Sequence, residues 1–196
     1  MCLGGRDLDE ILVDHCIEKF KQSTGVDLSL DKRARNRLQT SCETAKITLS
    51  TEFEATIRLL AIHQGTNFEL KITRDEFEAK VQDTLERVKA PVRMALEEAD
   101  LDTSEIKKVV LVGGSTRIPW IKAWLEEEFG FPPSDDLNAD EGVAKGATMM
   151  AGILSGQFGQ DAPVLQDLAP LTLGVRLVQD TVGVLIKRGT SIPCEH

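Results

Sequence analysis

Apolar residues in the first half of the chain recur first at helical spacing and then alternate with polar residues. One helical stripe starts at Asp7 and Glu10, a capping-box-like pair, and ends at Gly25. A second stripe follows Asp31, a helix-capping residue. The pattern predicts two amphipathic helices with the apolar stripes Leu8, Ile11, Leu12, Cys16 and Phe20, and Ala34, Leu38, Cys42, Ala45 and Leu49.

Alternating apolar residues then predict two half-buried strands joined by a turn at Gln64 and Gly65. Thr73 and Glu76 form a capping box that opens a third helix, which Pro91 is expected to break or kink. Residues 4–81 therefore read as an α+β subdomain. The inward positions are Phe53, Ala55, Ile57 and Leu59, then Phe68, Leu70 and Ile72, then Phe77, Val81, Leu85 and Val88.

Residues 109–119, VVLVGGSTRIP, hold the most informative pattern in the chain. Four consecutive apolar β-formers predict a strand buried on both faces. Gly113 and Gly114 then allow a sharp turn and a close backbone approach, and Pro119 stands near the start of a new helix. Such a turn either seats a nucleotide at the end of a strand or merely connects a strand to a helix.

The remaining segments complete an α/β pattern over residues 82–157. Asn138 and Glu141 resemble the start of a helix that ends at Gly156, and Gly142 and Gly146 predict close packing on one of its faces. Residues 157–163 read as a linker. Segments 164–175 and 182–187 predict short strands, with Gly183 and Gly189 as bends, and two strands form no stable unit alone. We therefore expect that the chain stops inside a domain.

Composition narrows the classes of function. The 196 residues carry a net charge of −9, which argues against a nucleic-acid surface. The four cysteines form no CxxC pair, so no zinc or other metal site is predicted, and Cys16 and Cys42 are expected to pack as small hydrophobes. No secretory leader or membrane span is visible. These features predict a soluble intracellular protein.

Glu43, Lys46 and Ser50 stand three and seven residues apart in the second predicted helix. At about 100° per residue they share one face. A carboxylate, an ammonium and a hydroxyl in one line suit a ribose and the edge of a base. The alternative is an exposed Glu–Lys pair that contributes a few tenths of a kcal/mol.

Several segments together resemble the 70-kilodalton heat-shock chaperone family. They are LGGRDLD, CETAKITLS, ITRDEFE, VVLVGGSTRIPWI, NADEGVAKGA, ILSG, LAPLTLGV and VLIKRGTSIP. The resemblance implies half of an actin-like ATPase domain, namely a ribonuclease H-like α/β part with an inserted α+β subdomain, and then the first two strands of a β-sandwich. The implied parts are lobe two over 4–81 and 82–157, an interdomain linker over 158–168, and a truncated substrate-binding β-domain over 169–196.

The resemblance also implies the site. Glu43, Lys46 and Ser50 would bracket the adenosine of ATP or ADP from one side. The opposite wall would be Gly113, Gly114, Ser115, Arg117 and Ile118, with the Arg117 guanidinium stacked on adenine and Asp140 as a polar neighbour. Ile47 stands where some members carry a second stacking arginine, and Ala139 replaces a usual proline.

The resemblance places the family's phosphate loops, catalytic residues and Mg²⁺ ligands outside these residues, so no catalytic or metal-binding residue is expected here. We expect no useful ATP hydrolysis by this chain alone. The implied partners are unfolded polypeptides, J-domain co-chaperones, and nucleotide-exchange factors on residues 4–81. An alternative function is a non-catalytic interaction module for those factors. A sugar kinase or an actin-like filament protein is less consistent with the motifs LAPLTLGV and VLIKRGTSIP. The family likeness favours a cytoplasmic location.

Overall fold

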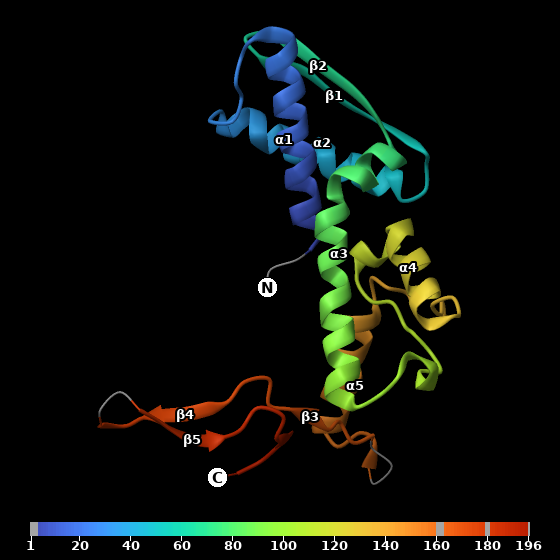
Figure 1. Cartoon of the computed structure of the whole chain (residues 1–196), viewed down its shortest axis with the longest axis vertical. Helices are drawn as coiled ribbons and strands as arrows, with labels where there is room; N and C mark the ends of the chain where they lie inside the picture. The colour runs from blue at the N-terminus through green and yellow to red at the C-terminus, as the bar shows by residue number, and fades with distance from the viewer. Residues whose placement is uncertain (1–3, 160–162, 179–180, 196) are drawn as a thin grey trace. The chain divides into compact units, whose positions relative to one another are not determined.

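The computed structural model describes residues 4–159, 163–178 and 181–195. The chain divides into two compact units, residues 1–143 and 144–196, and each is described by itself. The first unit holds the helices α1 to α4 and the hairpin β1–β2, and Figure 1 shows this hairpin alongside α1 and α2. The second unit holds most of α5 and the short strands that follow it.

The first two helices form where the apolar stripes predict them. Helix α1 spans Gly5–Thr24 and ends at Gly25, whose φ of 76° is left-handed, as expected. The expected capping pair at its start is wrong, because Gly4 is the N-cap and donates its N–H to Asp7 at 2.7 Å. Helix α2 spans Lys32–Leu49 and is capped by Asp31, which confirms the predicted start.

Strands β1 (Glu54–His63) and β2 (Thr66–Thr73) pair antiparallel, with Ile57 opposite Leu70. Their inward side chains pack on the helices as predicted, with one exception. Phe53 lies before β1 and is 79% exposed, so its assignment to the inward face is wrong. The Arg74 guanidinium lies 4.8 Å from its ring centroid, and this cation–π contact holds the ring at the surface.

Helix α3 spans Arg74–Ala99 and begins at the predicted capping box of Thr73 and Glu76. It runs through Pro91 without a break. Phe77, Val81 and Leu85 join the core, while Val88 is partly buried. One continuous core therefore connects α1, α2, the hairpin, α3 and the later helix α4.

The expected buried strand at residues 109–112 is not formed. Val110 makes a single parallel bridge to Ser134, and Val110 and Val112 are 45% and 41% exposed. A strand needs neighbours to complete its ladder, and among the described residues this segment has only that bridge. The 3-10 helix η1 (Thr103–Glu105) precedes the segment. The 3-10 helix η2 (Gly114–Arg117) and helix α4 (Pro119–Phe129) follow it, with Pro119 at the helix start as predicted.

Helix α5 spans Gly142–Leu154 and begins later than expected, because the Asn138 side chain accepts the N–H of Asp140 and closes a turn before the helix. A Cβ on Gly142 would lie 2.9 Å from Leu137, which confirms a close approach there. The same expectation is wrong for Gly146, where open space surrounds the Cβ position.

The described residues of the second unit form four short strands where two were expected. Strand β3 (Asp167–Leu168) pairs with β6 (Ser191–Ile192), and β4 (Leu173–Arg176) pairs with β5 (Val182–Ile186). Gly183 lies inside β5 instead of forming a bend, whereas Gly189, with φ 80°, turns the chain. The expected linker includes residues 160–162, which lie outside the described residues. No helix among the described residues is both long and apolar enough to cross a membrane.

Candidate functional site

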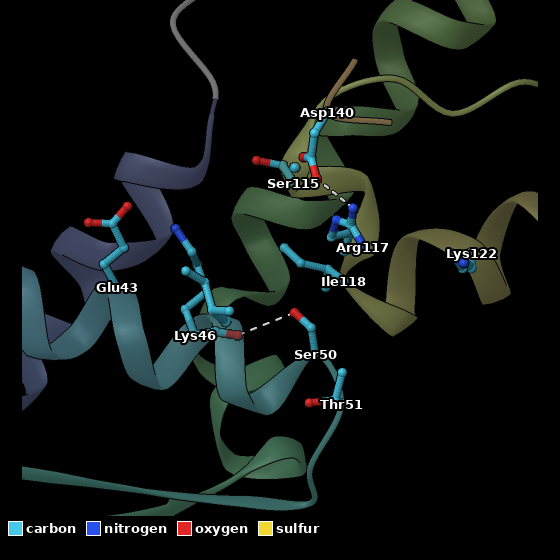
Figure 2. A pocket seen from close by; sticks show the side chains of 11 residues that line it. Glu43, Lys46, Ser50, Thr51, Ser115, Arg117, Ile118, Lys122 and Asp140 are labelled. Carbon is cyan, nitrogen blue, oxygen red and sulfur yellow. Dashed lines mark hydrogen bonds and ion pairs between the residues drawn. The ribbon is translucent and has the colours of Figure 1, made fainter. Parts of the chain in front are cut away.

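A cavity of about 710 Å³ lies in the first unit between the C-terminal half of α2 and the turn that precedes α4 (Figure 2). Eight of the nine residues predicted for a ligand site line this cavity. The ninth, Gly113, directly precedes the lining residue Gly114 in the chain. The structure therefore brings together two segments about seventy residues apart in sequence. The lining residues are Glu43, Lys46, Ile47, Ser50, Thr51, Gly114, Ser115, Arg117, Ile118, Lys122 and Asp140.

Lys46 is the most constrained charge in this cavity. Its Nζ lies 2.8 Å from Asp9 Oδ1 and donates to the carbonyl of Gly5 at 3.0 Å. The Asp9 side chain is only 5% exposed. Burial raises the pKa of Asp9, and the Lys46 ammonium opposes that rise. The alternative of a simple Glu43–Lys46 surface pair is wrong, because Lys46 pairs with Asp9. Glu43 is exposed and has no ion-pair partner among the described residues.

The end of α2 presents hydroxyl groups to the cavity. Ser50 Oγ donates to the Lys46 carbonyl at 3.3 Å, and Thr51 Oγ1 donates to the Thr48 carbonyl at 3.2 Å. Each oxygen keeps lone pairs that accept hydrogen bonds from a ligand. Ile47, 62% exposed, adds an apolar surface on the same wall.

The opposite wall depends on the conformation of Gly113. Its φ of 93° is one that glycine adopts readily, and its N–H donates to the Ala139 carbonyl at 2.8 Å. This bond brings the neighbouring Asp140 to the turn, where Asp140 Oδ2 lies 2.5 Å from Arg117 Nη2. Figure 2 shows this pair on the side of the cavity that faces Lys46 and Ser50. Asp140 therefore fixes the position of the guanidinium.

Four residues that contribute to the site were missed by the sequence reasoning. Gly5 lies between the walls, since a Cβ there would stand 3.0 Å from Lys46 Nζ and 3.1 Å from Ser115 Oγ. Asp9 holds Lys46, while Thr51 and Lys122 line the cavity. Adjacency to Ser50 was the only signal for Thr51. The contributions of Gly5, Asp9 and Lys122 arise from tertiary packing.

Chemically, the cavity is lined by three cationic side chains, three hydroxyls and two carboxylates around partly apolar walls. Pockets of this size hold drug-sized molecules, and a few placed polar groups set their orientation. Within residues 4–159, 163–178 and 181–195, no cluster of three or more His, Cys, Asp or Glu side chains could hold a metal ion.

Comparison with known proteins identifies the family. The model of a family described as Hsp70 protein matches residues 1–196. The chain is 42% identical over 195 residues to a heat shock 70 kDa protein of Trichophyton rubrum, covering 97% of this chain and 30% of that protein. It is also 42% identical to a mitochondrial-type heat shock protein 70 of Encephalitozoon cuniculi, covering 97% and 33%.

A heat shock 70 kDa protein of Neurospora crassa is 41% identical, again over 97% of this chain and 30% of the relative. The chain thus spans about a third of the length of the curated relatives it matches. Because the family match covers every residue, the chain belongs to the Hsp70 chaperone family.

Proposed function

We propose that the cavity between α2 and the 113–118 turn is the adenosine half of an ATP or ADP site in an ATP-dependent chaperone. One observation carries this proposal: eight residues chosen from sequence for that role line a single cavity of about 710 Å³. In the proposed complex, Glu43, Lys46 and Ser50 face the ribose. Arg117, held by Asp140, stacks on the base.

The same proposal assigns the parts of the chain. Residues 4–81 and 82–157 are the two parts of lobe two of an actin-like nucleotide-binding domain. Residues 158–168 are the interdomain linker, and 169–196 begin a substrate-binding β-sandwich. The pairing of Asp167 and Leu168 with β6 ties the end of the proposed linker to the second unit.

Titration calorimetry with adenosine and ADP tests the site. We expect both ligands to bind with similar affinity, because the lining residues proposed here contact base and ribose but no phosphate. Arg117→Ala removes the stacking surface, which is worth about 0.5–2 kcal/mol and therefore weakens binding about two- to thirtyfold. Arg58→Ala, at an exposed ion pair on the hairpin, is the matched control and should leave binding unchanged. Equal losses for the two variants would overturn the proposal.

We further propose that this chain does not hydrolyse ATP on its own. Phosphoryl transfer depends on metal ions and cations placed around the phosphates, and the family resemblance places those groups elsewhere. Magnesium-dependent release of phosphate by the purified chain, abolished by Arg117→Ala, would contradict this. In the whole protein the nucleotide site would control binding of unfolded polypeptides, with J-domain co-chaperones as further partners. The cytoplasmic location stays a prediction.

A second candidate function is binding of nucleotide-exchange factors by residues 4–81. The observation that favours it is that α1, α2 and the hairpin supply most of the buried residues in the core of the first unit. A pull-down of the purified chain with a purified exchange factor tests this function. Binding of the factor without measurable ADP binding would favour the interaction module over the nucleotide site.

A further inference from the structure

The turn that ends α2 is held from outside by Arg74, the first residue of α3. The Arg74 side chain donates from Nε to the Leu49 carbonyl at 2.8 Å and from Nη2 to the Glu52 carbonyl at 2.9 Å. These two carbonyls flank Ser50 and Thr51, which line the cavity. Figure 1 shows the start of α3 beside the end of α2, and Figure 2 shows Ser50 and Thr51 where α2 ends. One guanidinium therefore grips the short segment that brings both hydroxyls to the cavity.

The chemistry of this contact suits a guanidinium. The last carbonyl groups of a helix carry partial negative charge and lack partners within the helix. Arginine supplies a full positive charge and several donors in a rigid, planar fork, so it can bind two carbonyls at once. The backbone of Arg74 adds a further bond, since its N–H donates to the Phe53 carbonyl at 2.8 Å. The Phe53 ring lies against the same guanidinium, with its centroid 4.8 Å from Cζ.

The hydrogen bonds inside the turn are all local. The N–H of Ser50 donates to the Ile47 carbonyl, and the N–H groups of Thr51 and Glu52 both donate to the Thr48 carbonyl. Bonds between residues three or four apart define the shape of the turn, but they do not fix its place in the molecule. Arg74 begins a helix whose inner face is buried in the core, so it ties the turn to the rest of the first unit.

A second arginine makes the same kind of contact away from the cavity and provides a matched comparison. Arg37 on α2 donates to the Leu60 carbonyl at 2.6 Å and to the Ala61 carbonyl at 2.9 Å. Arg37 and Arg74 are both half-buried. Neither Arg37 nor its two partners line the cavity. The loss of a two-carbonyl contact can therefore be measured both beside the cavity and away from it.

We propose that Arg74 is a positioning residue that holds the turn in place, so that Ser50 recognises the hydroxyl groups of a bound ribose. In this proposal Arg74 does not contact the ligand. It determines how well the site distinguishes a ribose from a sugar that lacks these hydroxyls. The identity of the ligand rests on the proposed adenosine site, whereas the hold of Arg74 on the turn does not.

Hydrogen exchange in the 196-residue chain tests the hold on the turn without any ligand. Arg74→Ala should speed exchange at the amides of Ser50, Thr51 and Glu52 at least about tenfold, because two hydrogen bonds are lost and the turn opens locally. Arg74→Lys keeps the charge but loses the fork, so exchange should again be faster than in the native chain. Arg37→Ala should leave these amides unchanged.

Three results of this experiment would overturn the hold of Arg74 on the turn. The first is unchanged exchange in Arg74→Ala. The second is equal acceleration by Arg37→Ala, which would indicate a general loss of stability. The third is native exchange in Arg74→Lys, which would mean that charge alone suffices and that the two-carbonyl fork has no role.

Titration calorimetry with adenosine and 2′,3′-dideoxyadenosine tests the effect on recognition. The native chain should bind adenosine more tightly than the dideoxy compound. Arg74→Ala should narrow this preference about two- to tenfold, the usual value of one hydrogen bond, by weakening adenosine alone. Ser50→Ala should narrow it equally, and Arg74→Ala added to Ser50→Ala should have little further effect, because both act through one hydroxyl. Arg37→Ala should bind both compounds as the native chain does.

A purely structural role would weaken both compounds alike, so the ratio of the two affinities separates it from positioning. Equal losses for both compounds in Arg74→Ala, or an effect that adds in full to that of Ser50→Ala, would overturn the positioning role. Equal affinities in the native chain would show that the site does not recognise the sugar hydroxyls. If the native chain binds neither compound, the proposed function fails, and hydrogen exchange alone decides whether Arg74 holds the turn.

Discussion

At the scale of single residues, the pair of Asp9 and Lys46 controls the charge in the cavity. Asp9→Asn removes the counter-charge of a lysine whose side chain is only 13% exposed. We expect a loss of about 1–3 kcal/mol in the free energy of unfolding, the usual effect of removing one buried polar partner. Urea unfolding measures it. Asp14→Asn, at the exposed pair with Arg35, is the control and should change stability by less than about 1 kcal/mol.

His15 on α1 predicts a pH dependence of stability. Burial, and then the charges of Lys80 and Lys19, lower the pKa of His15 below its ordinary 6.5. The unfolded chain therefore takes up this proton at a higher pH than the folded chain. The contribution of His15 to the free energy of unfolding is fully present above pH 6.5. It is lost as the pH falls from 6.5 through the pKa of His15 in the folded chain.

The test compares the native chain with His15→Gln by urea unfolding at pH 7.5 and at pH 5. The native chain should lose more stability between the two pH values than the variant does. The remaining ionisable groups are the same in both proteins, so their contributions cancel in the difference. Equal losses would show that His15 titrates alike in the folded and unfolded chains.

At the scale of elements, two glycines with different backbone conformations give a matched pair of predictions. Gly113 has φ of 93° at the start of the turn, so Gly113→Ala should destabilise the chain by about 1–2 kcal/mol. Gly146 lies inside α5 with open space around it, so Gly146→Ala should stabilise this helix by about 0.5–1 kcal/mol. Chemical unfolding followed by circular dichroism measures both. If both substitutions stabilise the chain, or both destabilise it, the conformation assigned to one of the two glycines is wrong.

Local signals explain what the sequence predicted well. The starts of α2 and α3 follow from Asp31 and Thr73, whose side chains cap the helix that each precedes. The apolar stripes likewise identified the core faces of α1, α2 and the hairpin. In the site, helical spacing placed Glu43, Lys46 and Ser50 together, and the resemblance supplied the opposite wall.

The failures share a non-local cause. The segment 109–112 has strand composition, but its bridge partner Ser134 is more than twenty residues away and adds only one contact. Helical spacing suggested Glu43 as the ion-pair partner of Lys46. In the structure the partner of Lys46 is Asp9, which belongs to another helix. Spacing along one element says which side chains share a face. It does not say which element packs against that face.

At the scale of the whole chain, the two units differ in how much they bury. The continuous apolar core lies within residues 8–125 of the first unit. In the described part of the second unit, Ala169 is the only buried hydrophobic side chain. Strands β4 and β5 instead expose apolar residues, among them Leu173, Val175, Val182, Val184 and Leu185. The stability of the first unit should therefore be independent of the strands.

A chain that ends at Gly156 tests this directly. It keeps every member of the main core and α5, and it removes the exposed apolar strands. Its melting temperature, followed by the fluorescence of the two tryptophans, should lie within about 2 °C of that of the full chain, because every residue of the main core is kept. Its aggregation at high concentration should fall, since exposed apolar strand edges are templates for association. A drop of several degrees would mean that the strands support the core, and equal aggregation would mean that β4 and β5 are covered in solution.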